Sequence, residues 1–225
     1  MLAIILVAAL GVIVLPQLWI THTISRHGKH RADLPGTGAE LARHLLDRFD
    51  LGHVTVESTE LGDHYDPEAK AVRLLAKHHD GRSVSAAAVA AHEVGHALQD
   101  ANGDRLLALR QRLAGFATLT DRIAVWFFMA APILGILART PLAFAALLGL
   151  GVALLAVRVV VNLVTLPVEF DASFAKALPI LEEGRYLSGG DIAAGRSVLR
   201  AAALTYVAGA LFSLVNLARW MRLLR

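Results

Sequence analysis

The chain has 225 residues, a formal net charge of +3 and no cysteine. The missing cysteines exclude a disulfide framework, a thiolate metal site and thiol redox chemistry. Hydrophobic residues make up 56% of the chain and the mean hydropathy is +0.54, so the composition is too apolar for an ordinary soluble domain.

The first element is an uncharged segment of 19 residues, Leu2–Ile20. At 1.5 Å per residue a helix of this length can span a bilayer core. The segment has neither a basic start nor a cleavage site of small residues, which favours a retained membrane anchor over a cleaved signal peptide.

Residues 21–121 form the main polar segment. A capping pattern at Thr37–Glu40 predicts an amphipathic helix that ends near Gly52. Val54–Val56 and Ala71–Leu75 have the residue types of short strands, and Gly62–Pro67 between them is rich in turn formers. This order predicts a small strand pair beside the helix that follows.

That helix carries the most informative motif of the chain, His92-Glu93-Val94-Gly95-His96. Histidines four apart lie on one helix face and can bind one Zn²⁺, while the Glu between them can act as general base on the metal-bound water. The flanks are almost wholly apolar, and an apolar helix face accommodates such polar groups only if something satisfies them. Ser83 or Ser85 is the expected N-cap, and Gly103 follows the last turn. The motif predicts a zinc peptidase.

Three more apolar blocks follow: Ile123–Ala138, Pro141–Val157 and Ala201–Ala218. Only two residues separate the first two, which predicts an antiparallel helical hairpin. The alternative of buried core helices would need more polar chain to cover them than is available. We therefore expect a mainly α integral membrane protein with about four transmembrane helices and lipid as a partner.

These elements divide the chain into five expected segments. They are an N-terminal anchor (1–21), a metallopeptidase segment (22–121), a transmembrane hairpin (122–166), a third-ligand helix with its loop (167–198) and a C-terminal transmembrane or membrane-associated helix (199–225).

Basic residues flank the apolar blocks, as the positive-inside rule requires of cytoplasmic segments. They show no interleaving with aromatic residues of the kind that binds nucleic acid, so we expect no nucleic-acid partner. The expected location is the cell membrane, with several spans and the active site on the cytoplasmic side. Two spans after the metal helix, residues 158–197 return to that side and can supply a third ligand.

A catalytic zinc commonly has three protein ligands. Glu169 is the best remaining candidate, because it follows an apolar run and Pro167, which can open a new helix. Asp100 and Asp104 extend the metal helix itself, where a third ligand is awkward. Glu182 and Glu183 lie beside a glycine in an expected loop.

Three strings carry a family resemblance: Asp63-His64-Tyr65-Asp66-Pro67, Ala90–Gln99 around the metal motif, and Leu166–Ser173 around Glu169. The chain resembles the YugP-type family of bacterial membrane-bound neutral zinc metallopeptidases and is similar to the HtpX and CAAX-protease clan. The resemblance implies that His92, His96 and Glu169 bind zinc and that Glu93 is the general base.

One position departs from the clan pattern. The acid that the clan places four residues after its Glu ligand is Ser173 here, and the nearest acid is Asp171. On an α-helix a residue at i+2 faces away from the ligand, so Asp171 is expected to cap or anchor its helix.

The predicted reaction is hydrolysis of a protein or peptide substrate, which includes the possibility of membrane proteins. Tyr65, His64, Arg185 and Tyr186 are candidates to stabilise the oxyanion, and spacing does not choose among them. The alternative function is a non-catalytic membrane scaffold that keeps a structural zinc. Closed structural sites usually have four ligands, often Cys, which favours the enzyme. A channel or transporter would need more polar residues within its spans.

Overall fold

In the computed structural model, residues 2–137 and 140–209 are described. The chain forms two compact units, each assembled from separate stretches of sequence. Unit 1 contains Met1–Pro16, Leu109–Leu166 and Tyr206–Arg225. Unit 2 contains Gln17–Ala108 and Pro167–Thr205, and it carries the metal motif.

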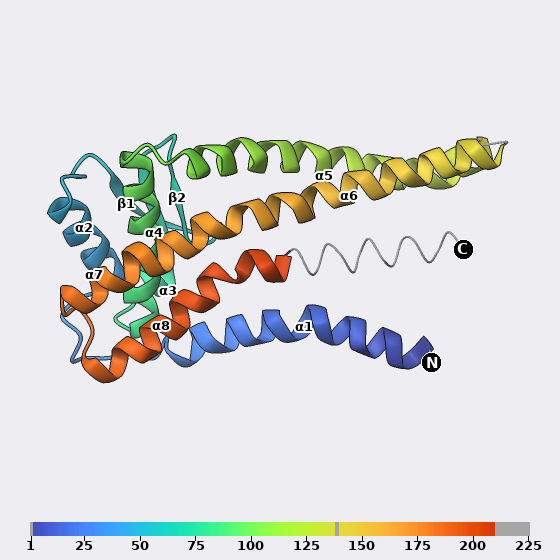
Figure 1. The fold of residues 1–225 in the computed structure, drawn as a ribbon. Coiled ribbons are helices and arrows are strands. Elements are labelled where there is room, and N and C mark those ends of the chain that lie inside the picture. Colours follow the sequence, from blue (N-terminus) through green and yellow to red (C-terminus); the bar gives the residue numbers. More distant parts are fainter. Residues whose placement is uncertain (1, 138–139, 210–225) are drawn as a thin grey trace. The chain divides into compact units, whose positions relative to one another are not determined.

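Unit 1 is built from helices (Figure 1). It holds the first part of α1 (Leu2–Arg26) and most of α5 (Arg105–Leu137) and α6 (Pro141–Phe170). The chain reverses direction between α5 and α6 (Figure 1), as the short link between the two apolar blocks predicts.

The prediction of an integral membrane protein with four transmembrane helices is wrong for the described residues. Among residues 2–137 and 140–209, no helix is both long enough and apolar enough to cross a membrane. The apolar blocks do not coincide with the folded helices, which extend into charged sequence, as α5 does from Arg105 onward. Half of the fourth block, Ala201–Ala218, lies outside the described residues; its first three residues end α8 (Gly189–Ala203).

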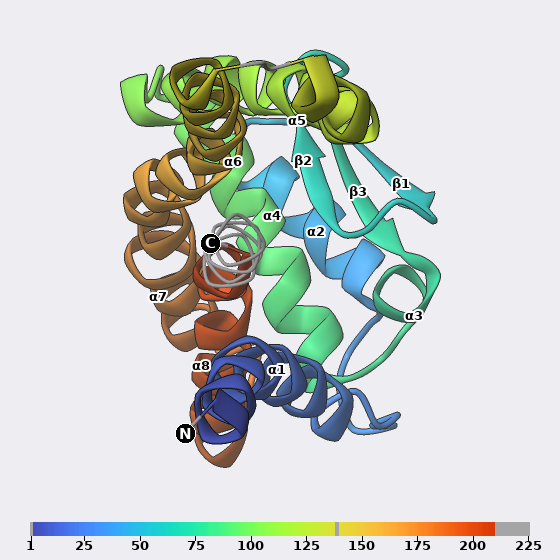
Figure 2. The same cartoon turned by 90° about the vertical axis from the view of Figure 1, so that its right-hand side faces the viewer.

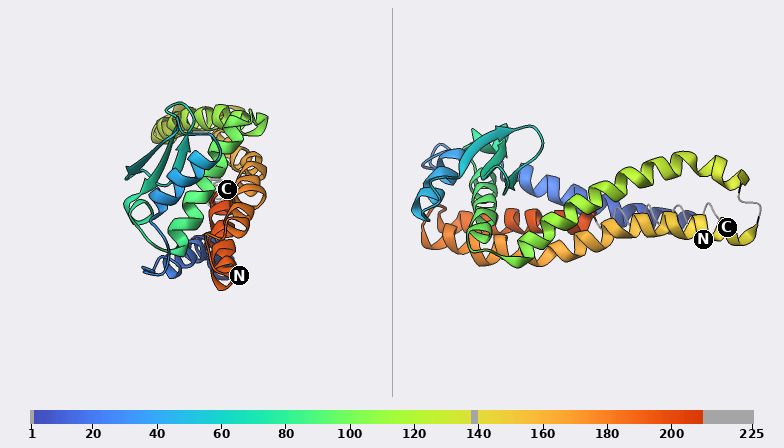
Figure 3. Two further views of the ribbon diagram at one scale, coloured as in Figure 1. Left: turned by 90° about the vertical axis from the view of Figure 1, so that its left-hand side faces the viewer. Right: turned by 90° about the horizontal axis from the view of Figure 1, so that it is seen from above.

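Unit 2 is arranged in layers around α4 (Val84–Ala101) (Figures 2 and 3). A small sheet and α2 (Gly38–Arg48) lie on one side, and both contact α4. On the other side α4 packs on α8 and on the segment after α6, which comprises η1 (Asp171–Ala177) and α7 (Leu178–Glu183). The core consists of apolar side chains from all these layers.

The helix ends follow from the capping residues. Thr37 and Glu40 form the predicted capping box on α2, each side chain bonding the other's backbone N–H. Ser83 is the N-cap of α4 and its hydroxyl accepts from Ala86 N. The prediction that this helix ends near Gly52 is about one turn too late, because α2 ends at Arg48. Asp50, just beyond it, takes a positive φ of 59°.

The sheet has three strands rather than the predicted pair: β1 (Thr55–Thr59), β2 (His64–Asp66) and β3 (Ala71–Leu75), in the order β1-β3-β2. β3 runs parallel to β1 and antiparallel to β2. The sequence does not predict β2, because this strand has only three residues and lies inside the turn-rich string. Short α3 (Ala76–His79) continues directly from β3.

A salt bridge ties the loop after α1 to the start of α8. The Arg31 guanidinium binds Asp191 through two hydrogen bonds of 2.9 and 3.1 Å, and it also binds Asp33. These hydrogen bonds lower the pKa of Asp33 to about 2 and lower the pKa of Asp191 as well. Both residues therefore stay ionised well into the acid range.

This salt bridge predicts an acid-dependent stability difference. Because folding lowers both carboxyl pKa values, its contribution is complete above an unfolded-state pKa of about 3.9 and is lost as the pH falls towards about 2. We expect Arg31→Gln to lower the melting temperature at pH 7 and to approach the wild type as the pH falls through about 2. Arg196→Gln, which removes the exposed pair with Glu182, is the control and should change little at either pH. An Arg31→Gln effect that is the same at both pH values would contradict the assignment.

Candidate metal centre

α4 places the two histidines of the motif in the interior of unit 2. Its positions before the motif are mostly Ala, and this small-residue helix can be approached from several sides. His92 and His96 are buried, and their ring centroids lie 4.7 Å apart. Glu93 is buried too, at 5% exposed.

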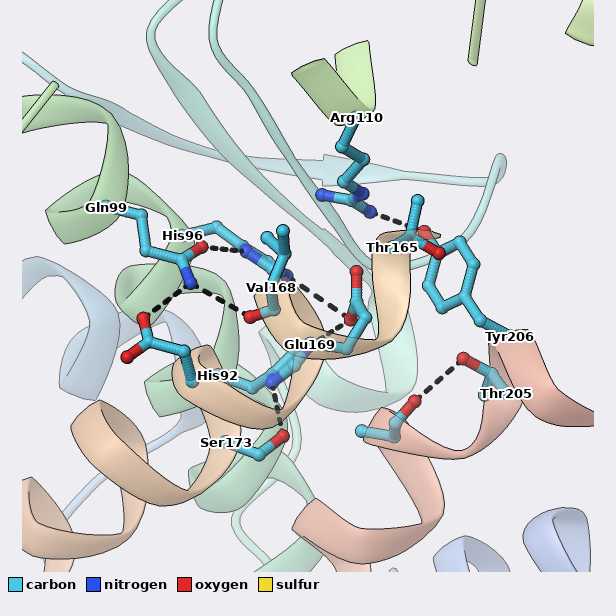
Figure 4. Close-up of polar contacts among 12 residues, drawn as sticks. His92, His96, Gln99, Arg110, Thr165, Val168, Glu169, Ser173, Thr205 and Tyr206 are labelled. Carbon is cyan, nitrogen blue, oxygen red and sulfur yellow. Dashed lines mark hydrogen bonds and ion pairs between the residues drawn. The ribbon is translucent and has the colours of Figure 1, made fainter. Parts of the chain in front are cut away.

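Glu169 reaches the same place from the end of α6. Its Oε2 lies 3.3 Å from His92 Nε2 and 3.5 Å from His96 Nε2. Only 1% of Glu169 is exposed. One candidate ligand atom from each of the three residues lies within 4.8 Å of the other two (Figure 4). Among the described residues this is the one group of three or more His, Cys, Asp or Glu so arranged.

The predicted start of a helix at Pro167 is wrong, because α6 continues through this proline to Phe170. A proline removes one backbone hydrogen bond, and the helix can continue past it. The next turns, η1, are π-helical. Single π-turns are rare and often occur at functional sites.

A glycine of the motif allows the two segments to meet. A Cβ built on Gly95 would lie 2.8 Å from the carbonyl oxygen of Ala172 and 3.3 Å from its Cα. The backbones of α4 and η1 therefore touch at this point, directly beside His96. Without this close approach Glu169 could not lie so near the histidines.

The Nδ1 atom of each imidazole, the ring nitrogen that does not face Glu169, contacts a second side chain (Figure 4). His92 Nδ1 lies 3.0 Å from Ser173 Oγ, and His96 Nδ1 lies 2.8 Å from Gln99 Oε1. Both Nε2 atoms face the Glu169 carboxylate. The donor set of two imidazole nitrogens and one carboxylate oxygen is one that catalytic zinc sites use, so these residues fit the ion.

Asp171 is not in this group. It accepts a hydrogen bond of 2.7 Å from Gln99 Nε2 and pairs with Lys176. Burial raises the pKa of its carboxyl, but the hydrogen bonds from Lys176 and Gln99 outweigh burial, so the pKa is lowered overall. The carboxylate is ionised and bound to the neighbours of the site rather than to the site itself.

Gln99 and Ser173 are the two residues of the site that sequence analysis missed. Spacing held a signal for both: Gln99 follows His96 by one helical turn, and Ser173 occupies the position where the clan has an acid. Neither is a usual zinc ligand, so a search for ligands passes over them.

The oxyanion candidates are engaged elsewhere in the fold. Tyr65 donates a hydrogen bond to Asp100, Tyr186 bonds His44 and Arg48, and His64 bonds a backbone carbonyl. Arg185 lies in a turn with a positive φ of 53°. These contacts give the first three residues structural roles.

Comparisons with known proteins agree with the chemistry of the site. A family model described as "Putative neutral zinc metallopeptidase" matches residues 2–225. The chain is 39% identical over 217 residues to the "Putative membrane protease YugP" of Bacillus subtilis (strain 168), covering 96% of this chain and 92% of that protein. No solved structure matches the chain significantly.

The contact at Gly95 predicts a specific sensitivity. Gly95→Ala forces η1 away from α4, and overpacking of this kind costs about 1–3 kcal/mol. Chemical denaturation should report that loss of unfolding free energy. Gly190→Ala in α8 is the matched control, since a Cβ there meets nothing within 4 Å and should be neutral or slightly stabilising. Equal effects of the two changes would show that the close approach is unimportant.

Proposed function

This chain belongs to the family of neutral zinc metallopeptidases, and from that premise we propose that it is a zinc-dependent peptidase whose site is His92, His96, Glu93 and Glu169. The observation that carries the proposal is the convergence of ligand atoms from α4 and the end of α6 within 4.8 Å. His92, His96 and Glu169 would hold the zinc. When bound, zinc supplies an acidified water and a Lewis acid for the substrate carbonyl.

The chain's own residues then have distinct tasks. The two imidazoles and the Glu169 carboxylate hold the ion in a buried position, where electrostatic interactions are stronger than in water. Glu93, next to His92 on α4, takes a proton from the attacking water and returns it to the leaving amine. The substrate is a protein or peptide.

A scaffold with a structural zinc is the competing function. The described residues offer three ligands to one ion, whereas closed structural sites have four. A site with three leaves a coordination position for water. The open position favours hydrolysis and makes Glu93 the residue on which the two functions differ.

We expect Glu93→Gln to keep zinc and to lose peptide hydrolysis by about 10²–10⁴-fold, the usual contribution of a general base. Zinc per chain is measured by elemental analysis of the purified full chain, and hydrolysis with a casein-type protein substrate. Turnover at the wild-type rate would refute the role of Glu93. A wild type that binds zinc and cleaves nothing would favour the scaffold.

Glu169→Ala is the companion variant for the ligand set. It should weaken zinc binding by more than about 100-fold, because even loss of a ligand's hydrogen-bonding partner costs about 10–100-fold. Glu183→Ala removes an exposed carboxylate from the same unit and should bind zinc as the wild type does. Unchanged zinc in Glu169→Ala would move the third ligand to another residue.

The name of the Bacillus relative places that protein at a membrane. We propose membrane association for this chain also. Large apolar side chains along α5 support the proposal: Leu119, Trp126, Met129 and Ile133 are each more than half exposed. Exposed apolar patches of this kind commonly mark membrane or protein contacts. The cytoplasmic side stays a prediction from charge.

Flotation with vesicles of phosphatidylcholine and phosphatidylglycerol tests this association. Trp126→Asp combined with Met129→Asp should weaken binding by more than about tenfold, because each large apolar side chain contributes about 1.5–3 kcal/mol on burial. Leu61→Asp is the control, since Leu61 is 91% exposed in the β1–β2 loop of unit 2. Equal flotation of all three proteins would exclude α5 as the membrane contact.

A further inference from the structure

We propose that Gln99 and Ser173 are positioning residues that fix both histidines in the tautomer whose Nε2 faces the metal position. The inference rests on the proposed function, since it assigns these side chains a role towards the zinc ligands. Neither residue touches the metal position or the reacting atoms. Each acts through one imidazole (Figure 4).

Ser173 determines which ring nitrogen of His92 carries the proton. The serine hydroxyl has one proton, and it donates this proton to the carbonyl oxygen of Leu199 at 3.2 Å. The hydroxyl can then only accept from His92 Nδ1, at 3.0 Å. The imidazole must therefore carry its proton on Nδ1, which leaves the lone pair of Nε2 free to bind a metal.

In the same way, Gln99 determines which ring nitrogen of His96 carries the proton. Its Nε2 donates to the carbonyl oxygen of Val168 at 2.9 Å, which can only accept, and to Oδ2 of Asp171 at 2.7 Å. A flipped amide would place its oxygen against both acceptors, so the orientation is fixed. The amide oxygen therefore faces His96 Nδ1 at 2.8 Å and requires the proton to be there.

The same hydrogen bonds tie the histidines to the segment that carries the third ligand. Val168 and Asp171 flank Glu169 in sequence, and Ser173 follows in η1. Gln99 thus links His96 to the residues on both sides of Glu169, and Lys176 holds Asp171 from the far side. The orientation of both imidazoles and the position of the carboxylate are set together by these contacts.

A purely structural role of Gln99 and Ser173 would have different consequences for zinc binding. A buried amide or hydroxyl that only stabilises the fold needs any partner of the right polarity, and its loss lowers stability without a specific effect on the metal. Positioning requires that zinc affinity falls more than metal-free stability does. The chain offers a matched pair of serines to separate the two.

Ser173 and Ser85 are both fully buried, and each donates to a backbone carbonyl, Ser85 to Ile24 at 2.7 Å. Only Ser173 also contacts an imidazole. We expect Ser173→Ala to weaken zinc binding by about 10–100-fold and Ser85→Ala to leave it unchanged. Zinc affinity is measured on the full-length metal-free chain by competition with a chromophoric chelator, and stability by thermal unfolding without metal.

Gln99→Met keeps the length of the side chain and removes the acceptor, so it should also weaken zinc binding by about 10–100-fold. Gln99→Glu keeps an acceptor for His96 but sets a carboxylate against Asp171. Adding Asp171→Asn to it restores a donor at position 171, and this double variant should recover part of the zinc affinity, since the carbonyl of Val168 still lacks its donor. The visible absorption of bound Co²⁺ should shift in the single variants and return towards the wild type in the double variant.

The results distinguish this inference from the proposed function. A wild type without zinc affinity would overturn both. A wild type that binds zinc, with equal affinity in Ser173→Ala and Gln99→Met, would overturn the positioning roles alone. The same conclusion would follow if Ser85→Ala weakened zinc binding as much as Ser173→Ala. If Gln99→Met fails to fold, the serine pair and the double variant still decide the question.

Discussion

A carboxylate buried between two imidazoles is the interaction on which unit 2 depends. Burying a carboxylate is costly unless charge or hydrogen bonds compensate for it. A divalent cation at the point where Glu169, His92 and His96 converge would compensate for this cost. The geometry of the site and the packing of the interior of this unit therefore depend on each other.

Close backbone packing makes that convergence possible. α4 approaches its neighbours with Ala and Gly, and Gly95 touches Ala172 directly. Small residues at such positions are needed because any side chain would separate the backbones and draw Glu169 away from the histidines. The metal motif thus contributes more than ligands, since its fourth residue provides the space that the third ligand requires.

The π-helical turn after α6 gives the surroundings of the site their geometry. Glu169 faces the histidines, while Asp171, from the next turn, binds Gln99, the partner of His96, and Ser173 contacts His92 itself. A regular α-helix would turn a residue at i+2 away from the ligand face. The wider turn accounts for the engagement of Asp171 through Gln99, which α-helical spacing does not predict.

Much of this protein follows from the sequence alone. The capping box at Thr37, the N-cap at Ser83, strand β3 and the placing of His92 and His96 on one helix face depend on local spacing and residue chemistry, which a short stretch of sequence specifies. Tertiary structure decided the rest. Strand β2 exists only because β3 pairs with it, and α6 passes through Pro167. Apolar composition overstated the number of membrane spans, because it does not show where the helices end or which charged residues they include. Gln99 and Ser173 acquire their contacts only when α4 meets η1, since a hydrogen bond between distant residues depends on packing that no local pattern encodes.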